Sequence, residues 1–221
     1  MAELSFGRAV HEALDLAMSM DDAVFLSGEG VGVSIHDNPN MPTYGLLKKF
    51  GPTRVKDTPV SEAAIAGLAV GASCLGLRPV VEIMFLPFIT LALDMLVNHA
   101  AKLRYLSGGK SSFPLTVRVK AGVGFAAGCQ HSHNLEAWLA HSPGLKVVFP
   151  STPEDAKGLL KTAIRDDNPV IFFESFALYG RKGPVPEEDY TIPLGKAEVK
   201  REGKDVTIVA VSTMDSSIVA R

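Results

Sequence analysis

Short apolar segments alternate with helix-forming segments along most of this chain, and this alternation constrains the fold more than any other feature. The apolar segments are residues 23–26, 79–84, 115–119, 146–150 and 170–173. Helical spacing or helix-capping residues mark 6–19, 61–76, about 88–106, 134–140 and 153–165. Apolar strands that alternate with helices are typical of a parallel sheet with helices on both faces. The sequence therefore predicts an α/β fold, in which functional residues gather at the carboxyl ends of the strands.

The composition is that of a globular protein. Hydrophobic residues make up 47% of the 221 residues and charged residues 21%. A formal net charge of -2 gives no indication of a nucleic-acid partner or an anionic membrane surface. No apolar stretch is long enough to cross a bilayer, and the N-terminus has no signal-peptide pattern. The two cysteines, Cys74 (expected to be buried) and Cys129, favour a reducing compartment, so we expect a cytoplasmic protein.

The segment 57–62, Asp-Thr-Pro-Val-Ser-Glu, contains the first candidate site. Pro59 disfavours helix at the residue before it, and Ser61 can cap the helix that follows. Glu62 then lies in the first turn of a helix whose next eleven residues, 63–73, are small or apolar. A single carboxylate at the start of such a helix indicates an enzyme site.

Glu29 is a second candidate because it directly follows a buried strand. The alternative is a solvated turn carboxylate. The glycines around it, at 28, 30 and 32, hint at a dinucleotide-binding loop. We reject that interpretation because no helix begins at these glycines.

His131 lies on a Gly/Ala-rich loop and is a candidate proton donor or acceptor, since histidine titrates near neutrality. The alternative is a loop histidine that contacts a partner. A metal pair with His133 lacks further ligands at suitable spacing, and a Cys129–His131 nucleophile is a weaker alternative.

Asp94 lies in an apolar stretch, 84–96, that is interpreted as core or subunit interface. Asp94 needs a partner if it is buried.

Several segments together resemble the beta subunit of thiamine diphosphate-dependent 2-oxo-acid dehydrogenases, the group of pyruvate, acetoin and branched-chain enzymes. The resemblance runs from about residue 4 to the end of the chain. Its segments are RVKDTPVSE at 54–62, GLRPVVE at 76–82, NHAAK at 98–102, QHS at 130–132, PGLKVV at 143–148 and PSTPEDAKGLL at 150–160.

The resemblance implies that the chain supplies the pyrimidine-binding half of a thiamine diphosphate site shared with an alpha chain. Glu62 then bonds the aminopyrimidine and activates the cofactor for decarboxylation and acyl transfer to a lipoyl group. Val60, Met84 and Phe88 form the apolar cradle of the aminopyrimidine. Glu29 belongs to a proton relay, together with Asp94, and His131 lies near the substrate.

The resemblance also implies metals and partners. A potassium ion is expected at the backbone of Leu115, Ala163, Asp166 and Asn168, and magnesium on the alpha chain, since no Gly-Asp-Gly…Asn pattern occurs here. The expected partners are an alpha subunit in an alpha2beta2 tetramer, a lipoyl-bearing acyltransferase core and a second beta chain.

The expected domains are a transketolase-like pyrimidine-binding domain at 1–180, a linker at 181–203 and the start of a truncated second domain at 204–221. That start comprises a strand at 205–211 and a helix from 213. The sequence departs from the family pattern at Gly30, Leu86-Pro87 and Met95. The alternatives are a transketolase-like carboligase subunit and a non-catalytic assembly or regulatory fragment.

Overall fold

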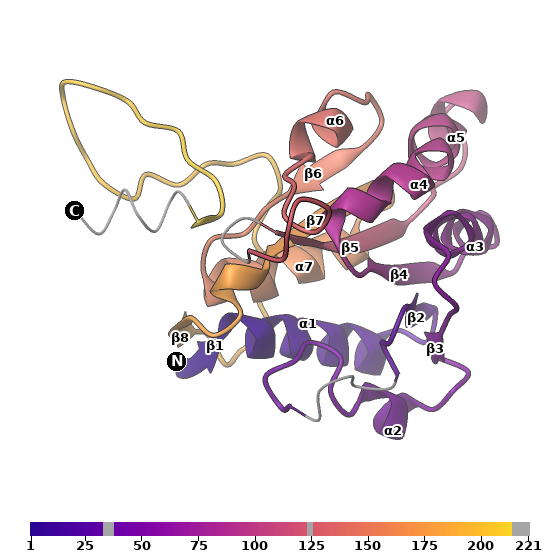
Figure 1. The fold of residues 1–221 in the computed structure, drawn as a ribbon, viewed down its shortest axis with the longest axis horizontal. Coiled ribbons are helices and arrows are strands. Elements are labelled where there is room, and N and C mark those ends of the chain that lie inside the picture. Colours follow the sequence, from indigo (N-terminus) through magenta and orange to yellow (C-terminus); the bar gives the residue numbers. More distant parts are fainter. Residues whose placement is uncertain (33–37, 123–125, 214–221) are drawn as a thin grey trace.

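A computed structural model describes residues 1–32, 38–122 and 126–213. Its centre is a six-stranded sheet in the order β3-β2-β4-β5-β7-β6, with every neighbouring pair parallel (Figure 1). The strands are β2 (Val24–Gly28), β3 (Val55–Asp57), β4 (Arg78–Ile83), β5 (Leu115–Ala121), β6 (Lys146–Val148) and β7 (Pro169–Ser175). The predicted α/β fold is confirmed.

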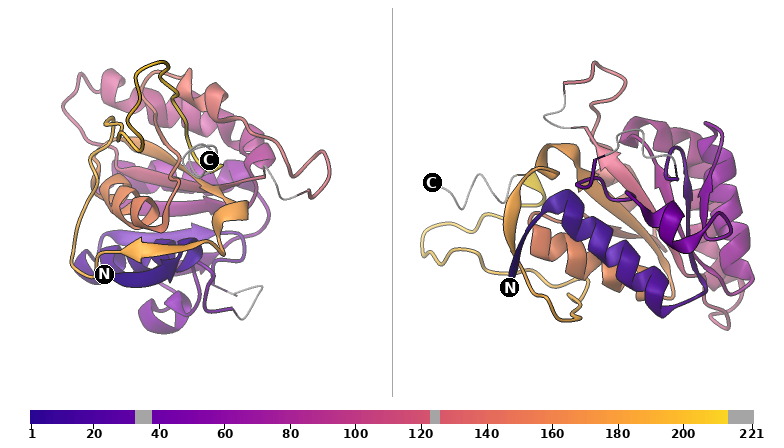
Figure 2. Two further views of the ribbon diagram at one scale, coloured as in Figure 1. Left: turned by 90° about the vertical axis from the view of Figure 1, so that its left-hand side faces the viewer. Right: turned by 90° about the horizontal axis from the view of Figure 1, so that it is seen from below.

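Helices cover both faces of this sheet (Figure 2). One face carries α1 (Phe6–Met20) and α7 (Pro153–Arg165), and the other carries α3 (Glu62–Cys74), α4 (Ile89–Leu93) and α5 (Ala101–Leu106). Two short helices, α2 (Leu46–Phe50) and α6 (Glu136–Ala140), lie in the connections, and α2 was not predicted. Within the described ranges, no helix has the length and apolar character that a membrane span requires.

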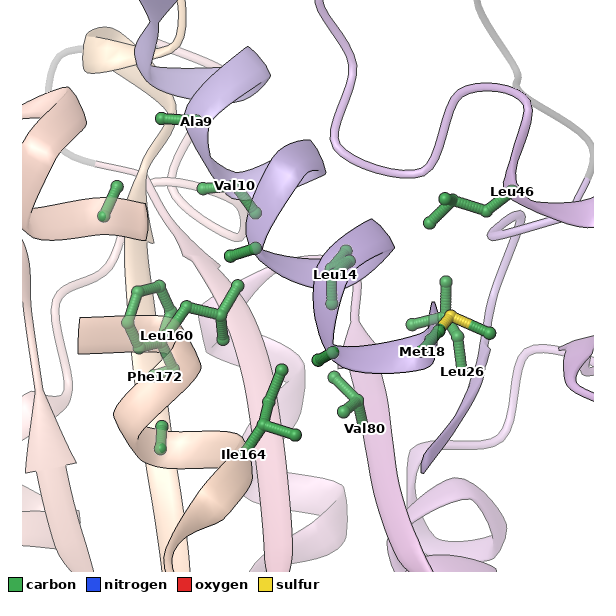
Figure 3. Packing of buried hydrophobic residues seen from close by; sticks show 14 of the residues in the cluster. Ala9, Val10, Leu14, Met18, Leu26, Leu46, Val80, Leu160, Ile164 and Phe172 are labelled. Carbon is green, nitrogen blue, oxygen red and sulfur yellow. The ribbon is translucent and has the colours of Figure 1, made fainter. Parts of the chain in front are cut away.

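The core between the sheet and the α1/α7 pair is apolar and closely packed. Val10 and Leu14 of α1 meet Leu160 and Ile164 of α7 over Phe172 of β7, all of them buried (Figure 3). Both helices begin with a side-chain cap. The Ser5 hydroxyl accepts from the Arg8 N–H (3.3 Å), and the Thr152 hydroxyl accepts from the Asp155 N–H (3.1 Å). Such caps satisfy N–H groups that a helix leaves unpaired at its start.

The helix expected at 88–106 is interrupted. A 3-10 turn, η1 (Leu86–Phe88), precedes α4, and a π-helical segment, η2 (Asp94–Ala100), separates α4 from α5. Asp94 is exposed there, at 64%, and accepts a hydrogen bond from the Asn98 amide (2.8 Å). His99 lies 3.7 Å from the Asp94 carboxylate. Asp94 is therefore exposed, and it has a hydrogen-bond partner in Asn98.

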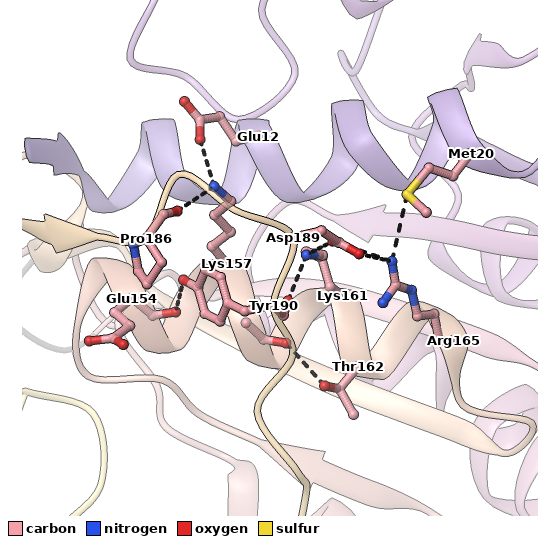
Figure 4. Close-up of polar contacts among 11 residues, drawn as sticks. Glu12, Met20, Glu154, Lys157, Lys161, Thr162, Arg165, Pro186, Asp189 and Tyr190 are labelled. Atoms are coloured by element: carbon pink, nitrogen blue, oxygen red, sulfur yellow. Dashed lines mark hydrogen bonds and ion pairs between the residues drawn. The ribbon is translucent and has the colours of Figure 1, made fainter. Parts of the chain in front are cut away.

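The segment after β7 packs against the domain. It forms a 3-10 turn, η3 (Phe176–Leu178), and then β8 (Lys182–Val185), which pairs antiparallel with β1 (Ala2–Ser5). Residues 186–192 lie along α7, where the Lys157 ammonium donates to Glu12 and to the Pro186 carbonyl, both at 3.1 Å (Figure 4). Lys161 pairs with Asp189 and donates to the Tyr190 carbonyl (2.6 Å).

The first part of the expected linker is thus bonded to α7, while the domain limits at 180 and 203 stay predictions.

The prediction of a strand at 205–211 was wrong, because the structure has no strand there. The side chains of Val206, Ile208 and Val209 are exposed instead, and the segment extends away from the sheet (Figure 1). A strand needs a partner strand to satisfy its backbone groups. Of the helix expected from 213, residues 214–221 lie outside the described ranges.

Candidate active site at the carboxyl ends of the strands

The chain brings most of the predicted site residues to one edge of the sheet. Glu29 follows β2, and Thr58 and Pro59 follow β3. Met84, Phe85 and Phe88 follow β4, and the loop that carries His131 follows β5. Because the strands are parallel, all their carboxyl ends lie at this same edge.

Glu62 is the first residue of α3, and only 6% of it is exposed. Its carboxylate makes no hydrogen bond to any described residue. Ser61 occupies the N-cap position, but its side chain makes no capping bond, so the predicted side-chain cap was wrong. The hydroxyls of Ser27 and Thr58 are also buried without a partner among the described residues. The Glu62 carboxylate and the Thr58 hydroxyl, which lies shortly before α3, are therefore polar groups that a ligand could satisfy.

His131 packs edge-on against two aromatic rings. Its ring centre lies 4.9 Å from that of Phe85 and 5.1 Å from that of Phe88, at interplanar angles of 77° and 86°. Gly122, just beyond β5, lets the loop backbone at His131 approach closely, because a Cβ atom at position 122 would lie 2.2 Å from the His131 carbonyl oxygen. The structure thus places the predicted histidine beside the predicted stacking ring of Phe88.

The charge of Glu62 acts on Glu29. Burial raises the pKa of Glu29, and the negative charge of Glu62 raises it further. The ammonium of Lys120 opposes this effect, and Glu82 reinforces it. Glu29 therefore holds a proton more readily than an ordinary glutamate, which suits a group that exchanges protons.

A buried network of charged residues lies behind this edge, and the sequence analysis missed it. Arg118 of β5 is fully buried and donates to Glu82 of β4 (2.8 Å) and to both carboxylate oxygens of Glu174 of β7 (2.6 and 2.9 Å). The Tyr179 hydroxyl donates to Glu174 (2.5 Å), and Lys120 donates to Glu82 (2.7 Å). The sequence signal that could have revealed this network is a set of charged residues inside strands that are otherwise apolar.

The network keeps the Glu82 carboxylate charged. Burial alone would raise the pKa of Glu82, but the charges and hydrogen bonds of Lys120 and Arg118 lower it to about 2. Burial and the neighbouring Glu174 raise the pKa of Tyr179, which stays a neutral hydrogen-bond donor. Two cations thus balance two carboxylates in the interior.

The remaining predicted site residues have varied positions. Met84 and Phe88 are half-buried, whereas Val60 is 70% exposed. The roles of Glu62, Glu29 and His131, and the cradle of Val60, Met84 and Phe88, stay predictions, because the geometry alone assigns no role. Both cysteines are exposed, so the expectation that Cys74 is buried was wrong: it lies on the outer side of α3.

The residues predicted to bind potassium lie at the opposite end of the sheet. Leu115 and Ala163 are buried, and the Asp166 carboxylate pairs with Lys146 and accepts from the Asn168 amide (2.8 Å). Arg78 donates to the Asp166 carbonyl (3.2 Å). Two positive side chains thus already contact Asp166, which disfavours a further cation there.

Two hollows in the surface lie away from Glu62. One, of about 540 Å³, is lined by Ala100, Ala101, Arg104, Tyr105, Gly108, Gly109, Gly144, Asn168 and Pro169. The other, of about 300 Å³, lies between α1 and the end of α7. Within residues 1–32, 38–122 and 126–213, no group of three or more His, Cys, Asp or Glu side chains is arranged to hold a metal ion.

Comparison with curated proteins finds close relatives. The chain is 49% identical over 218 residues to the beta subunit of acetoin:2,6-dichlorophenolindophenol oxidoreductase of Bacillus subtilis, and these residues cover 94% of this chain and 64% of the relative. It is 48% identical to a mitochondrial pyruvate dehydrogenase E1 beta subunit of rice (96% and 57% covered). It is 46% identical to the B. subtilis 2-oxoisovalerate dehydrogenase beta subunit (95% and 64%). The chain thus spans less than two thirds of each relative.

Solved structures share the fold. A split-gene transketolase, described as an inactive beta4 tetramer, superposes with a TM-score of 0.74 at 20% identity and covers 98% of this chain and 65% of that one. A transketolase from Leishmania mexicana gives 0.63 at 18% identity (86% and 27%). The family described as "Transketolase, pyrimidine binding domain" matches residues 2–182, which include the six strands of the central sheet and the whole candidate site. The chain therefore belongs to the transketolase pyrimidine-binding domain family.

Proposed function

We propose that this chain supplies the pyrimidine-binding half of a thiamine diphosphate site in the decarboxylating component of a 2-oxo-acid or acetoin dehydrogenase. The observation that carries the proposal is the buried Glu62 carboxylate, which has no hydrogen-bond partner among the described residues. A carboxyl group in that state suits the ring nitrogen of an aminopyrimidine, to which it can donate or from which it can accept a proton. The names of the relatives, all of them dehydrogenase or oxidoreductase beta subunits, support the reaction class.

The residues present fit one half of the cofactor. Phe88 offers an aromatic surface beside His131, and the Thr58 hydroxyl has no partner among the described residues and is free to bond a polar ring. The described residues offer no cluster that would bind a divalent metal, so the proposal assigns magnesium and the diphosphate to an alpha chain. When bound, thiamine diphosphate supplies the nucleophilic carbon and the electron sink for cleaving the bond next to a carbonyl.

The side chains of this domain then have separate tasks. Glu62 holds a proton at the pyrimidine ring, and the N-terminus of α3 fixes its position. Glu29, whose pKa is raised, exchanges a proton with the neighbouring acid. His131, held between Phe85 and Phe88, is placed to donate a proton at the substrate.

The proposal includes the expected partners. An alpha subunit completes the site in an alpha2beta2 tetramer, in which two beta chains contact each other, and a lipoyl-bearing acyltransferase accepts the acyl group. Potassium at Leu115, Ala163, Asp166 and Asn168 stays a prediction that Arg78 and Lys146 disfavour. The cytoplasmic location also stays a prediction, and several relatives are named as mitochondrial.

Reconstitution tests this function. The full-length chain, mixed with a cognate alpha chain, thiamine diphosphate and magnesium, is assayed on a panel of 2-oxo acids and acetoin. We expect turnover of one of them and at least about a hundredfold loss in Glu62→Gln, the scale of a lost acid–base group. Glu154→Gln is the matched control, because Glu154 is also a first-turn acid but is exposed. Wild-type turnover in Glu62→Gln would contradict the proposal.

A further inference from the structure

Lys120 takes no part in the proposed reaction, yet it lies next to the candidate site. Lys120 lies near the carboxyl end of β5, and its side chain is 12% exposed. Its ammonium donates to Glu82 Oε1 (2.7 Å), while Arg118 donates to the other oxygen, Glu82 Oε2 (2.8 Å). Both oxygens of Glu82 are thus occupied, and Lys120 is held at the end of the buried network.

Sheet geometry places this pair beside Glu29. In the register of β2 and β4, Glu82 lies opposite Gly28, the residue before Glu29. The backbones approach so closely that a Cβ atom on Gly28, whose φ is +154°, would lie 2.5 Å from the Glu82 carbonyl oxygen. Only glycine tolerates this approach. The backbone of Glu82, which carries the ion pair with Lys120, is therefore fixed opposite the residue that precedes Glu29.

The charges around Glu29 come from three elements. Glu62 of α3 and Glu82 of β4 are negative, and Lys120 of β5 is positive. Because Arg118 also neutralises Glu174, the network of Glu82, Arg118, Glu174 and Lys120 carries no net charge while Lys120 is present. Removing Lys120 leaves one uncompensated negative charge close to a pair of carboxyl groups.

We propose that Lys120 is a positioning residue: its ammonium, fixed by Glu82, sets the charge balance at the Glu29 carboxyl and so governs how readily Glu29 binds a proton. The effect on the Glu29 carboxyl is a property of this chain, whereas its consequence for turnover rests on the proposed function. Lys120 contacts no reacting atom. It acts through Glu82 and through the field at Glu29.

The test measures the Glu29 carboxyl directly. Carbon-13 NMR of the glutamate-labelled full chain follows its titration, and the signal is assigned by its loss in Glu29→Gln. In Lys120→Met the midpoint should rise by about one pH unit, a roughly tenfold gain in proton affinity. Lys120→Arg should restore the wild-type midpoint. The double variant Lys120→Met with Glu82→Gln removes one charge of each sign. Its Glu29 midpoint should therefore return most of the way to the wild-type value.

Lys146→Met is the matched control, because Lys146 pairs with Asp166 at the opposite end of the sheet and should leave the Glu29 midpoint unchanged. If Lys120→Met does not fold, Lys120→Gln carries the same charge change. An unchanged midpoint in the folded variant, or an equal rise in Lys146→Met, would overturn the proposal.

The pH profile of kcat/KM in the reconstituted pair separates the two claims. Its acidic limb should move in the same direction as the NMR midpoint. A shifted midpoint in a pair that turns over no 2-oxo acid or acetoin would refute the proposed function and leave the role of Lys120 standing. If the pair is active and Lys120→Met shifts the Glu29 midpoint but leaves the acidic limb of the kcat/KM profile unmoved, the claim that Lys120 affects turnover is refuted.

Discussion

Replacing Arg118 by methionine should destabilise the protein strongly. Arg118 is fully buried and makes three charged hydrogen bonds, one to Glu82 and two to Glu174. Methionine retains much of the apolar stem, so the main loss is electrostatic. Glu82 keeps Lys120, but among the described residues Glu174 keeps only the Tyr179 hydroxyl and becomes an unpaired charge in the interior. Breaking a buried ion pair in this way costs about 3–5 kcal/mol of the free energy of unfolding.

Urea unfolding followed by circular dichroism at pH 7 measures this cost, provided that the slope m is the same in wild type and variant. Lys49→Met is the control, since Lys49 pairs with Asp15 at the surface and should lose no more than about 1 kcal/mol. A loss below about 1 kcal/mol at pH 7 would refute the claim that Arg118 holds the network together.

Two smaller predictions concern pH and helix capping. The pKa of Glu82 is lowered from 4.5 to about 2, so its contribution of about 3 kcal/mol is full above pH 5 and is lost as the pH falls toward 2. The difference between the unfolding free energies at pH 7 and pH 3 should therefore be smaller in Glu82→Gln than in wild type. An equal difference in the two proteins would argue against this contribution of Glu82. Thr152→Ala should cost about 1 kcal/mol in urea unfolding, because the Asp155 N–H loses its cap; no change would show that the cap is dispensable.

The sequence predicted the sheet well because its strands are buried on both faces. Segment 170–173 is a continuous apolar run and segment 79–84 is apolar apart from Glu82, which is typical of strands in a covered parallel sheet. The predicted strand at 205–211 has the same apolar character but lacks a partner in the structure. An apolar pattern indicates that a segment tends to form a strand, and pairing decides whether it does.

The candidate site could be located only in part. Glu62 and His131 were found because a motif surrounds each of them, and parallel topology brings their loops to one edge. The network around Arg118 was missed because the residues that pair are 36 and 56 positions apart, so no local pattern connects them. The exposure of Cys74 was missed for a similar reason, since the small residues of α3 do not tell which side faces the sheet.

The central claim is that this chain holds half of a thiamine diphosphate site through Glu62 and depends on an alpha chain for the rest. Calorimetric titration of thiamine diphosphate with magnesium tests it, with this chain alone, the alpha chain alone and the mixture as samples. We predict that the mixture binds at least about a hundredfold more tightly than this chain alone, a difference of about 2.8 kcal/mol. Tight binding by the isolated chain, equal to that of the mixture, would contradict the shared site.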